Sequence, residues 1–203
     1  MAVHVLGNGP SIQLFDRDIW PEEDLFIGCN FSDAALRPDY TVMVDVRPMK
    51  HFYQGTGIDF CPTILSEKAI KYIENDKKGR KPSGALDIKE IIPMLKFEEI
   101  HQKWNLNSGQ HAAMYALKNE PHKQMHLWGI DTFWTNALKS GSDAIVRPNA
   151  DDRVREDIAD PWRQFWRKIF SDHGPYRFYI HAPMGATLYE EYLDLGNVER
   201  VFH

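Results

Sequence analysis

Short apolar runs that each end in a glycine turn are the feature that most constrains how this chain can fold. The runs at residues 3–6 and 25–27 end at Gly7 and Gly28, and segments with helical spacing separate such runs. Continuous apolar runs are typical of strands that are buried on both faces, as in parallel sheets whose connections are helices. We therefore predict an α/β fold with a doubly wound, mostly parallel sheet and helices on both faces.

Apolar runs and helical spacing also predict the remaining strands and helices. We expect further strands at residues 40–46, 62–65, 124–130, 177–180 and 199–202, the last at an edge of the sheet. We expect helices at residues 67–74, 83–95, 107–118, 151–170 and 187–193. Pro161 falls inside the fourth of these helices. Because proline lacks a backbone N–H, it either kinks that helix or begins a new one.

The composition is that of an ordinary globular domain. The chain of 203 residues has 24 Lys and Arg against 29 Asp and Glu, which gives a net charge of −5. We predict that residues 1–203 form a single domain, with residues 132–160 as a lid or insertion. An acidic chain offers no broad basic face, so we expect no nucleic acid partner. A homo-oligomer is compatible with the sequence.

The sequence also bears on the compartment. The two cysteines, Cys29 and Cys61, cannot build a disulfide framework and fit a reducing environment. The first residues lack the basic and apolar regions of a signal peptide, and no apolar stretch approaches the length of a membrane span. We therefore predict a cytoplasmic protein without a membrane span.

The turn after the first strand is a candidate anion site. It consists of Gly7, Asn8, Gly9, Pro10 and Ser11. At a strand-to-helix turn, free backbone N–H groups and the helix dipole can receive an anion. The motif lacks the lysine of a Walker A loop and differs from the GxGxxG fingerprint. The alternative is a tight turn with Ser11 as a helix N-cap.

Two more strand or helix ends carry polar groups. Asn30 follows the second strand, where its amide could read a base or a ribose, or simply form a turn. Asn107, Ser108 and Gly109 open a helix, with Asn107 or Ser108 as N-cap and a hydroxyl and amides for a ligand. His111 lies on the same face as Asn107 and is either a functional or a structural histidine.

The loop after residues 124–130 carries aromatic side chains. It begins at Asp131 and continues through Phe133 and Trp134. These rings could stack on a ligand or cap the core. The stripe of Trp162, Phe165, Trp166, Ile169 and Phe170 has helical spacing, and we predict that it packs in the core.

The order of these motifs resembles a known family. GNGPS at residues 7–11, Cys29-Asn30, Asn107-Ser108-Gly109 and Gly129-Ile130-Asp131 follow one another as in the bacterial lipooligosaccharide sialyltransferases. The resemblance spans about residues 3–134 and is weaker at residues 179–183. It implies a Rossmann-like fold and transfer of sialic acid from CMP-sialic acid without a metal. GNGPS also occurs in pterin diphosphokinase-like proteins.

The resemblance implies roles for individual residues. Asn8, Gly9 and Ser11 would contact the phosphate and sugar of the nucleotide. Asn30 would bind near the sugar donor, and Asp45 or Arg47 would stand where the family has a donor-contacting asparagine. Ser108 and Gly109 would hold the nucleotide through hydroxyl and backbone bonds.

The chain departs from the family at the catalytic groups. The family has a histidine general base before its last long helix, whereas residues 151–160 contain none. The family also uses two tyrosines on the leaving phosphate, and Phe133 stands in the place after Gly-Ile-Asp. We expect Arg153 and Arg155, or Arg147, to stabilise the leaving group instead. The candidate bases are His111, His173 and His181.

The acidic residues 151, 152, 157 and 160 allow a second interpretation. With Asp131 they could hold Mg²⁺ against a diphosphate, because hard cations prefer carboxylate oxygens. The alternative is a solvated helix start, where acidic side chains favour the positive end of the dipole.

Three hypotheses follow from the sequence. The favoured one is a glycosyltransferase that moves a sugar from a CMP-activated donor to an unknown acceptor hydroxyl, without a cofactor. The second is a Mg²⁺-dependent diphosphokinase-like enzyme. The third is a nucleotide-binding protein without catalytic activity, which the missing histidine and tyrosine suggest.

Overall fold

The computed structural model describes residues 1–30, 36–46, 48, 61–74, 87–138 and 156–203. Within these ranges the chain forms one sheet of eight strands in the order β5-β4-β3-β2-β1-β6-β7-β8. Every neighbouring pair runs parallel. The predicted α/β fold with a parallel sheet is confirmed.

The strands match most of the apolar runs of the sequence. They are β1 (Val3–Leu6), β2 (Leu25–Cys29), β3 (Tyr40–Met43), β4 (Thr63–Ser66), β5 (Ile88–Ile92), β6 (Gln124–Trp128), β7 (Arg177–Ala182) and β8 (Val198–Phe202). From β1 the chain builds outward to β5 on one side, and from β6 to β8 on the other. The strand order therefore reverses between β1 and β6, which is the position where doubly wound sheets bind ligands.

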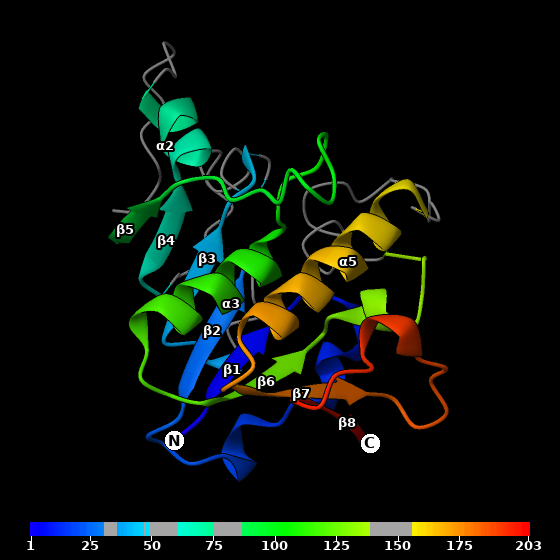
Figure 1. Ribbon diagram of the computed structural model, residues 1–203. Coiled ribbons are helices and arrows are strands. Elements are labelled where there is room, and N and C mark those ends of the chain that lie inside the picture. Colours follow the sequence, from blue (N-terminus) through cyan, green and yellow to red (C-terminus); the bar gives the residue numbers. More distant parts are fainter. Residues whose placement is uncertain (31–35, 47, 49–60, 75–86, 139–155) are drawn as a thin grey trace.

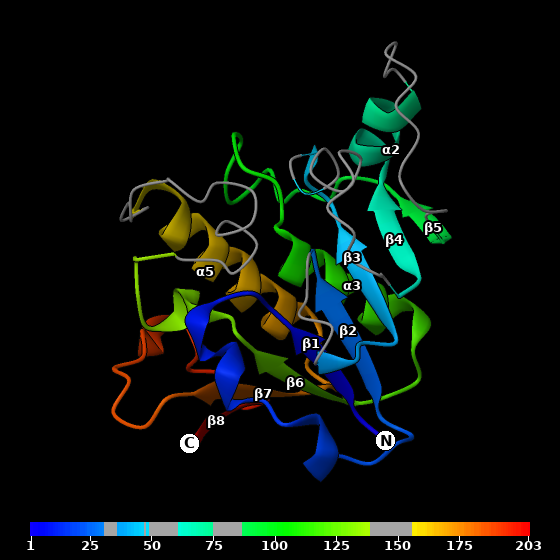
Figure 2. The same cartoon turned by 180° about the vertical axis from the view of Figure 1, so that it is seen from behind.

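Different elements cover the two faces of the sheet. The helices α3 (Ser108–Asn119) and α5 (Glu156–Asp172) lie side by side over one face (Figure 1). The short 3-10 helices η1 (Pro10–Leu14) and η2 (Arg17–Ile19) lie over the other (Figure 2). The helix α2 (Glu67–Glu74) follows β4, as predicted. No helix in the described ranges is long and apolar enough to cross a membrane.

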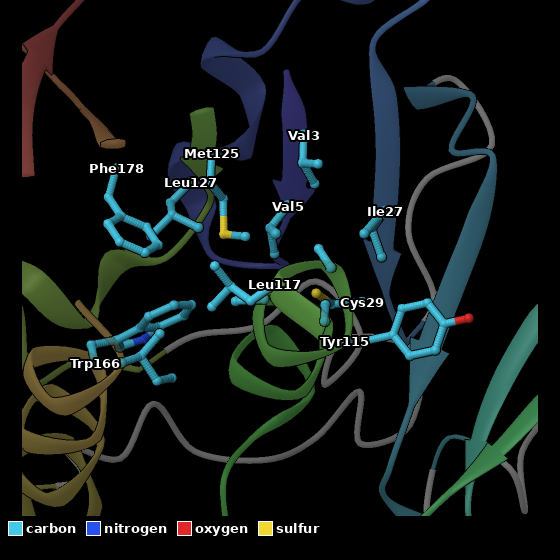
Figure 3. Packing of buried hydrophobic residues seen from close by; sticks show 14 of the residues in the cluster. Val3, Val5, Ile27, Cys29, Tyr115, Leu117, Met125, Leu127, Trp166 and Phe178 are labelled. Atoms are coloured by element: carbon cyan, nitrogen blue, oxygen red, sulfur yellow. The ribbon is translucent and has the colours of Figure 1, made fainter. Parts of the chain in front are cut away.

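The larger core lies between the sheet and the two long helices. Val5, Ile27 and Leu127 point from their strands toward α3, and Trp166 reaches the same layer from α5 (Figure 3). Each of these four side chains is at most 1% exposed. Burying such a side chain contributes roughly 1.5–3 kcal/mol to folding, so this layer is the main source of stability. The aromatic stripe of α5 belongs to this core, as expected.

The helix α5 continues through Pro161 without a break. Proline at this position leaves the carbonyl of Asp157 without its usual intrahelical N–H partner. The indole N–H of Trp104 donates to that carbonyl at 3.1 Å. A side chain from the loop before α3 thus satisfies the carbonyl that the proline leaves without a partner. Of the two outcomes predicted for Pro161, a new helix start is wrong, because α5 continues through it.

Two predicted helices are wrong. The segment at residues 83–95 contains the strand β5 within its described part. Its three isoleucines favour a pleated edge strand, and pairing with β4 overrides the helical spacing. In the segment at residues 187–193 only a short 3-10 helix, η5 (Glu190–Tyr192), forms.

A ladder of stacked rings covers the second face of the sheet. His4, Phe26, His126 and Tyr179 stand opposite one another on β1, β2, β6 and β7. Successive ring centroids are 4.6, 4.7 and 4.5 Å apart. Cross-strand aromatic neighbours of this kind stabilise the pairing of strands.

The histidines of this face are joined by hydrogen bonds. The ring nitrogens of His126 and His181 lie 2.9 Å apart, and those of His181 and His203 lie 2.8 Å apart. The indole of Trp128 donates to Nδ1 of His4 at 3.2 Å, so the proton of His4 lies on Nε2 and faces the Asp24 carboxylate. Burial lowers the pKa of His4 to about 4, of His126 to about 3 and of His181 to about 2.

These depressed pKa values predict a loss of stability in mild acid. A histidine whose pKa is lower in the folded state than in the unfolded state binds a proton on unfolding, so stability falls as the pH drops below about 6.5. Each such proton contributes a slope of about 1.4 kcal/mol per pH unit. Urea unfolding between pH 7 and pH 5 should show this slope. His181→Gln should reduce it by about one proton, and an equal slope in both proteins would contradict the assignment.

Candidate functional site

The candidate site lies at the carboxyl edge of the sheet, where the ends of β1, β2 and β6 meet the N-terminus of α3. The turn after β1 packs directly on the turn after β6. The N–H of Gly7 donates to the carbonyl of Trp128 at 2.8 Å, and that of Gly9 donates to Gly129 at 2.9 Å. These bonds continue the pairing of β1 and β6 past the ends of both strands.

Only glycine fits at two positions of this contact. A Cβ on Gly7 would lie 2.5 Å from the carbonyl oxygen of Gly129, and a Cβ on Gly9 would lie 2.7 Å from the carboxylate of Asp131. Gly129 itself has a φ of 63°, which L side chains rarely adopt. The glycines of GNGPS therefore allow close approach of the two turns.

A buried carboxylate closes the turn after β1. Asp131 begins the short 3-10 helix η4 (Asp131–Phe133) and accepts hydrogen bonds from both the N–H and the hydroxyl of Ser11, the N–H at 3.2 Å. Asp131 is 8% exposed and Ser11 is 4% exposed. Burial raises the pKa of Asp131, and the bonds from Ser11 oppose that rise.

The predicted anion cradle at residues 7–11 is therefore filled by the protein itself. The N–H groups of Gly7, Gly9 and Ser11 all have acceptors within the chain, and Pro10 has no N–H. The hydroxyl of Ser11 bonds Asp131, so it neither caps the turn nor faces a ligand. In this structure the turn offers no free amide at Gly7, Gly9 or Ser11.

Three other predicted residues do come together. The amide nitrogen of Asn8 donates to the carbonyl of Cys29, at the end of β2. The hydroxyl of Ser108 donates to Oδ1 of Asn30 at 2.9 Å, across 78 positions of sequence. Asn8 and Asn30 are half-buried, whereas Ser108 is buried. Polar groups from β1, β2 and α3 thus meet at the predicted edge.

The backbone of Asn30 is held in an unusual conformation. Its φ is 54°, in the left-handed region that asparagine tolerates better than most residues. The N–H of Asn30 donates to Val42, and its carbonyl accepts from the Thr41 hydroxyl, both at 2.9 Å. Strain of this kind persists where surrounding bonds enforce it, and it is frequent at functional sites.

The N-terminus of α3 presents backbone amides at the same place. Asn107 is the N-cap, and its side chain and that of Gln110 form a reciprocal capping box. This box was missed in the sequence, although the Asn-x-x-Gln spacing signals it. Gln110 also donates to the carbonyl of Trp162 and so joins α3 to α5. The N–H groups of Ser108 and Gly109 have no acceptor among the described residues.

His111 has a structural role. It is completely buried, its Nδ1–H donates to the carbonyl of Asn107 at 3.0 Å, and its Nε2 accepts from the N–H of Leu95 at 2.9 Å. Burial lowers its pKa. With both ring nitrogens engaged, the predicted general base has no nitrogen left for an acceptor hydroxyl.

The other two candidate bases are also placed elsewhere. His181 lies on the opposite face of the sheet, with both nitrogens bonded to other histidines. His173 follows the C-terminus of α5 and bonds the carbonyl of Ile169. That end of α5 precedes β7, so it lies at the far edge of the sheet from the candidate site.

The aromatic residues after β6 belong to the core. Phe133 is completely buried, with its ring 5.9 Å from that of Trp166 and 6.0 Å from that of Phe170. Of the two predicted roles, stacking on a ligand or capping the core, Phe133 therefore has the second and offers no surface to a ligand. Trp134 is partly buried and packs against the same core.

The remaining predicted site residues fall at or beyond the ends of the described ranges. Asp45 is exposed after β3, two strands away from β1. Arg47, Arg147, Arg153 and Arg155 lie outside the described residues, as do Asp151, Asp152 and residues 139–155 of the predicted lid.

The acidic residues that the structure describes do not gather around one point. Asp131 bonds Ser11, whereas Asp160 accepts from Tyr192 and from Gln164. Among the described residues, no group of three His, Cys, Asp or Glu side chains could hold a metal ion.

Comparison with known proteins relates this fold to solved enzymes. No family model and no curated protein matches the sequence. Two solved structures of the sialyltransferase CstII match at a TM-score of 0.51 and 16% identity, over 89% of this chain and 80% of theirs. One is a complex with a trisaccharide acceptor and CMP, and the other is monomeric CstII.

A third match agrees with these two. CstII from Campylobacter jejuni, in complex with a substrate analogue, cytidine-5'-monophosphate, matches at a TM-score of 0.50 and 16% identity. The match covers 88% of this chain and 79% of the CstII chain. The chain therefore has a sialyltransferase-like fold.

The close contact at Gly9 predicts a sharp response to one added methyl group. Gly9→Ala should cost roughly 2 kcal/mol or more of unfolding free energy, because its Cβ would clash with Asp131 and with the carbonyl of Gly129. Gly174→Ala is the matched control, since a Cβ there meets no atom within 4 Å. Chemical denaturation measures both. Equal stability of the two variants would contradict the packing described for this turn.

Proposed function

We propose that this protein binds a CMP-activated sugar at the N-terminus of α3 and transfers the sugar to an acceptor hydroxyl. One observation supports the proposal: the Ser108 hydroxyl, the Asn30 amide and two helix N–H groups without an acceptor among the described residues lie together beside the strand-order reversal of a sialyltransferase-like fold. Ligands of doubly wound sheets bind at this position. The CMP in the CstII complexes makes cytidine nucleotides the first ligands to test.

The arrangement suits a leaving nucleotide phosphate. The N–H groups of Ser108 and Gly109 and the positive end of the α3 dipole would face the phosphate oxygens. As the bond to the sugar breaks, negative charge grows on the phosphate. Fixed donors stabilise that charge without reorganisation, which lowers the barrier. The capping box of Asn107 and Gln110 holds this helix end rigid.

Asn8 and Asn30 would orient the nucleotide. Oδ1 of Asn30 is occupied by Ser108, and its amide nitrogen has no hydrogen-bond acceptor among the described residues. That nitrogen could donate to a ribose or base oxygen. The strained backbone of Asn30 keeps the amide directed toward Ser108.

A second candidate function is nucleotide binding without turnover. It is favoured by the three candidate histidines, none of which has a free nitrogen at this edge, and by the burial of Phe133. Release of CMP from a CMP-activated sugar, followed with and without acceptor sugars, distinguishes the two functions. CMP release above the uncatalysed rate supports transfer or hydrolysis, and binding alone supports the second function.

Binding of CMP should stabilise the protein and depend on the two polar side chains. At a hundredfold excess over Kd, the free energy of unfolding should rise by about 2.7 kcal/mol, an increase of roughly 5–10 °C in Tm. Ser108→Ala should weaken binding about tenfold through loss of a hydrogen bond. Asn30→Gly should also weaken binding about tenfold, because it removes the side-chain amide. It adds no backbone strain, since glycine readily adopts a positive φ.

A matched control is available on α5. The hydroxyl of Ser171 is exposed and bonds the carbonyl of Lys168, so Ser171→Ala should bind CMP like the wild type. Calorimetric titration measures all four proteins. The absence of any binding of cytidine nucleotides to the wild type, with or without Mg²⁺, would refute the proposed ligand.

A further inference from the structure

We propose that Asp131 is a specificity-determining residue, which restricts the site to nucleotides with a single phosphate and excludes nucleoside diphosphates. The inference rests on the proposed function and goes further, because it names the phosphate chemistry that the site accepts. It concerns the turn after β1, which in doubly wound folds commonly receives a pyrophosphate.

In this protein the carboxylate of Asp131 occupies that turn. The carboxylate accepts hydrogen bonds from both the N–H and the hydroxyl of Ser11. Its Cγ lies 2.7 Å from the position of a Cβ on Gly9, so the carboxylate packs directly against the turn. A negative charge thus lies at the turn where a second phosphate would bind.

Three N–H groups of the turn also have acceptors within the chain. Gly7 and Gly9 donate their N–H groups to Trp128 and Gly129, and Ser11 donates to Asp131. A phosphate at this turn would be repelled by the negative charge of Asp131 and would receive no hydrogen bond from the N–H groups of Gly7, Gly9 or Ser11. Like charges a few ångströms apart repel strongly where solvent is largely excluded. Asp131 is buried, so water screens its charge poorly.

The end of α3 provides for one phosphate. The N–H groups of Ser108 and Gly109 have no acceptor among the described residues, and they follow one another at this helix end. The Ser108 hydroxyl donates to Asn30 and so is not a further donor for the phosphate. Ile130, the residue before Asp131, packs against both this helix end and the turn: its Cδ1 lies 3.1 Å from the position of a Cβ on Gly109 and 2.6 Å from that of a Cβ on Gly7. We expect a phosphate chain that extends from α3 toward β1 to approach Asp131 after its first phosphate.

The test compares CMP with CDP, measured by calorimetric titration in EDTA. Wild type should bind CMP at least about tenfold more tightly than CDP, the penalty expected for one unscreened like-charge contact. Asp131→Asn keeps the shape of the side chain and an acceptor for the Ser11 N–H while removing the charge. It should bring the ratio of the two Kd values close to one and leave the affinity for CMP nearly unchanged.

Two further variants make the test specific. Asp131→Ala also removes the charge and should change the ratio in the same direction, which covers the case that Asp131→Asn fails to fold. Glu23→Gln removes an equal charge from an exposed position before β2, and it should keep the ratio of the wild type. Circular dichroism and thermal unfolding establish that each variant is folded.

The outcomes separate the two proposals. Wild type that binds neither CMP nor CDP refutes the proposed function and this inference with it. Equal affinity of the wild type for CMP and CDP, or a ratio that both Asp131 variants leave unchanged, overturns only the role of Asp131. Mg²⁺ that brings CDP binding of the wild type to the level of CMP also overturns it, because the site would then accept a metal-bound diphosphate.

Discussion

The contact between the turns after β1 and β6 is the constraint on which the candidate site depends. The N–H groups of Gly7 and Gly9 bond carbonyls at the end of β6, and Asp131 bonds Ser11 beyond them. This contact joins the two halves of the doubly wound sheet at the point where the strand order reverses. It also engages the N–H groups of Gly7, Gly9 and Ser11, whereas those of Ser108 and Gly109 at the start of α3 have no acceptor among the described residues.

Much of the fold follows from local sequence. Val3–Leu6, residues 25–27 and the run that begins at Gln124 are strands because buried parallel strands need continuous apolar side chains. The N-cap at Asn107 and the helix at Glu67–Glu74 were predictable from capping and spacing. Asn30 meets Ser108 because the carboxyl end of β2 and the N-terminus of α3 lie at the same edge of the sheet.

The rest depends on contacts between residues far apart in the sequence. The helical spacing of residues 83–95 could not reveal the pairing of β5 with β4. Pro161 is tolerated because Trp104 supplies a donor from another segment. His111 resembles a catalytic histidine in sequence, but the N–H of Leu95 occupies its second nitrogen. Ser11 resembles a phosphate ligand until Asp131, 120 positions later, takes both of its donors.

We propose that the phosphate of a bound nucleotide lies at the N-terminus of α3 and not at the glycine turn. A crystal structure of the protein with bound CMP would locate the phosphate. We expect its oxygens within hydrogen-bond distance of the N–H groups of Ser108 and Gly109, with the bonds between Ser11 and Asp131 intact. A phosphate bound on residues 7–11, with Asp131 displaced from Ser11, would refute this placement.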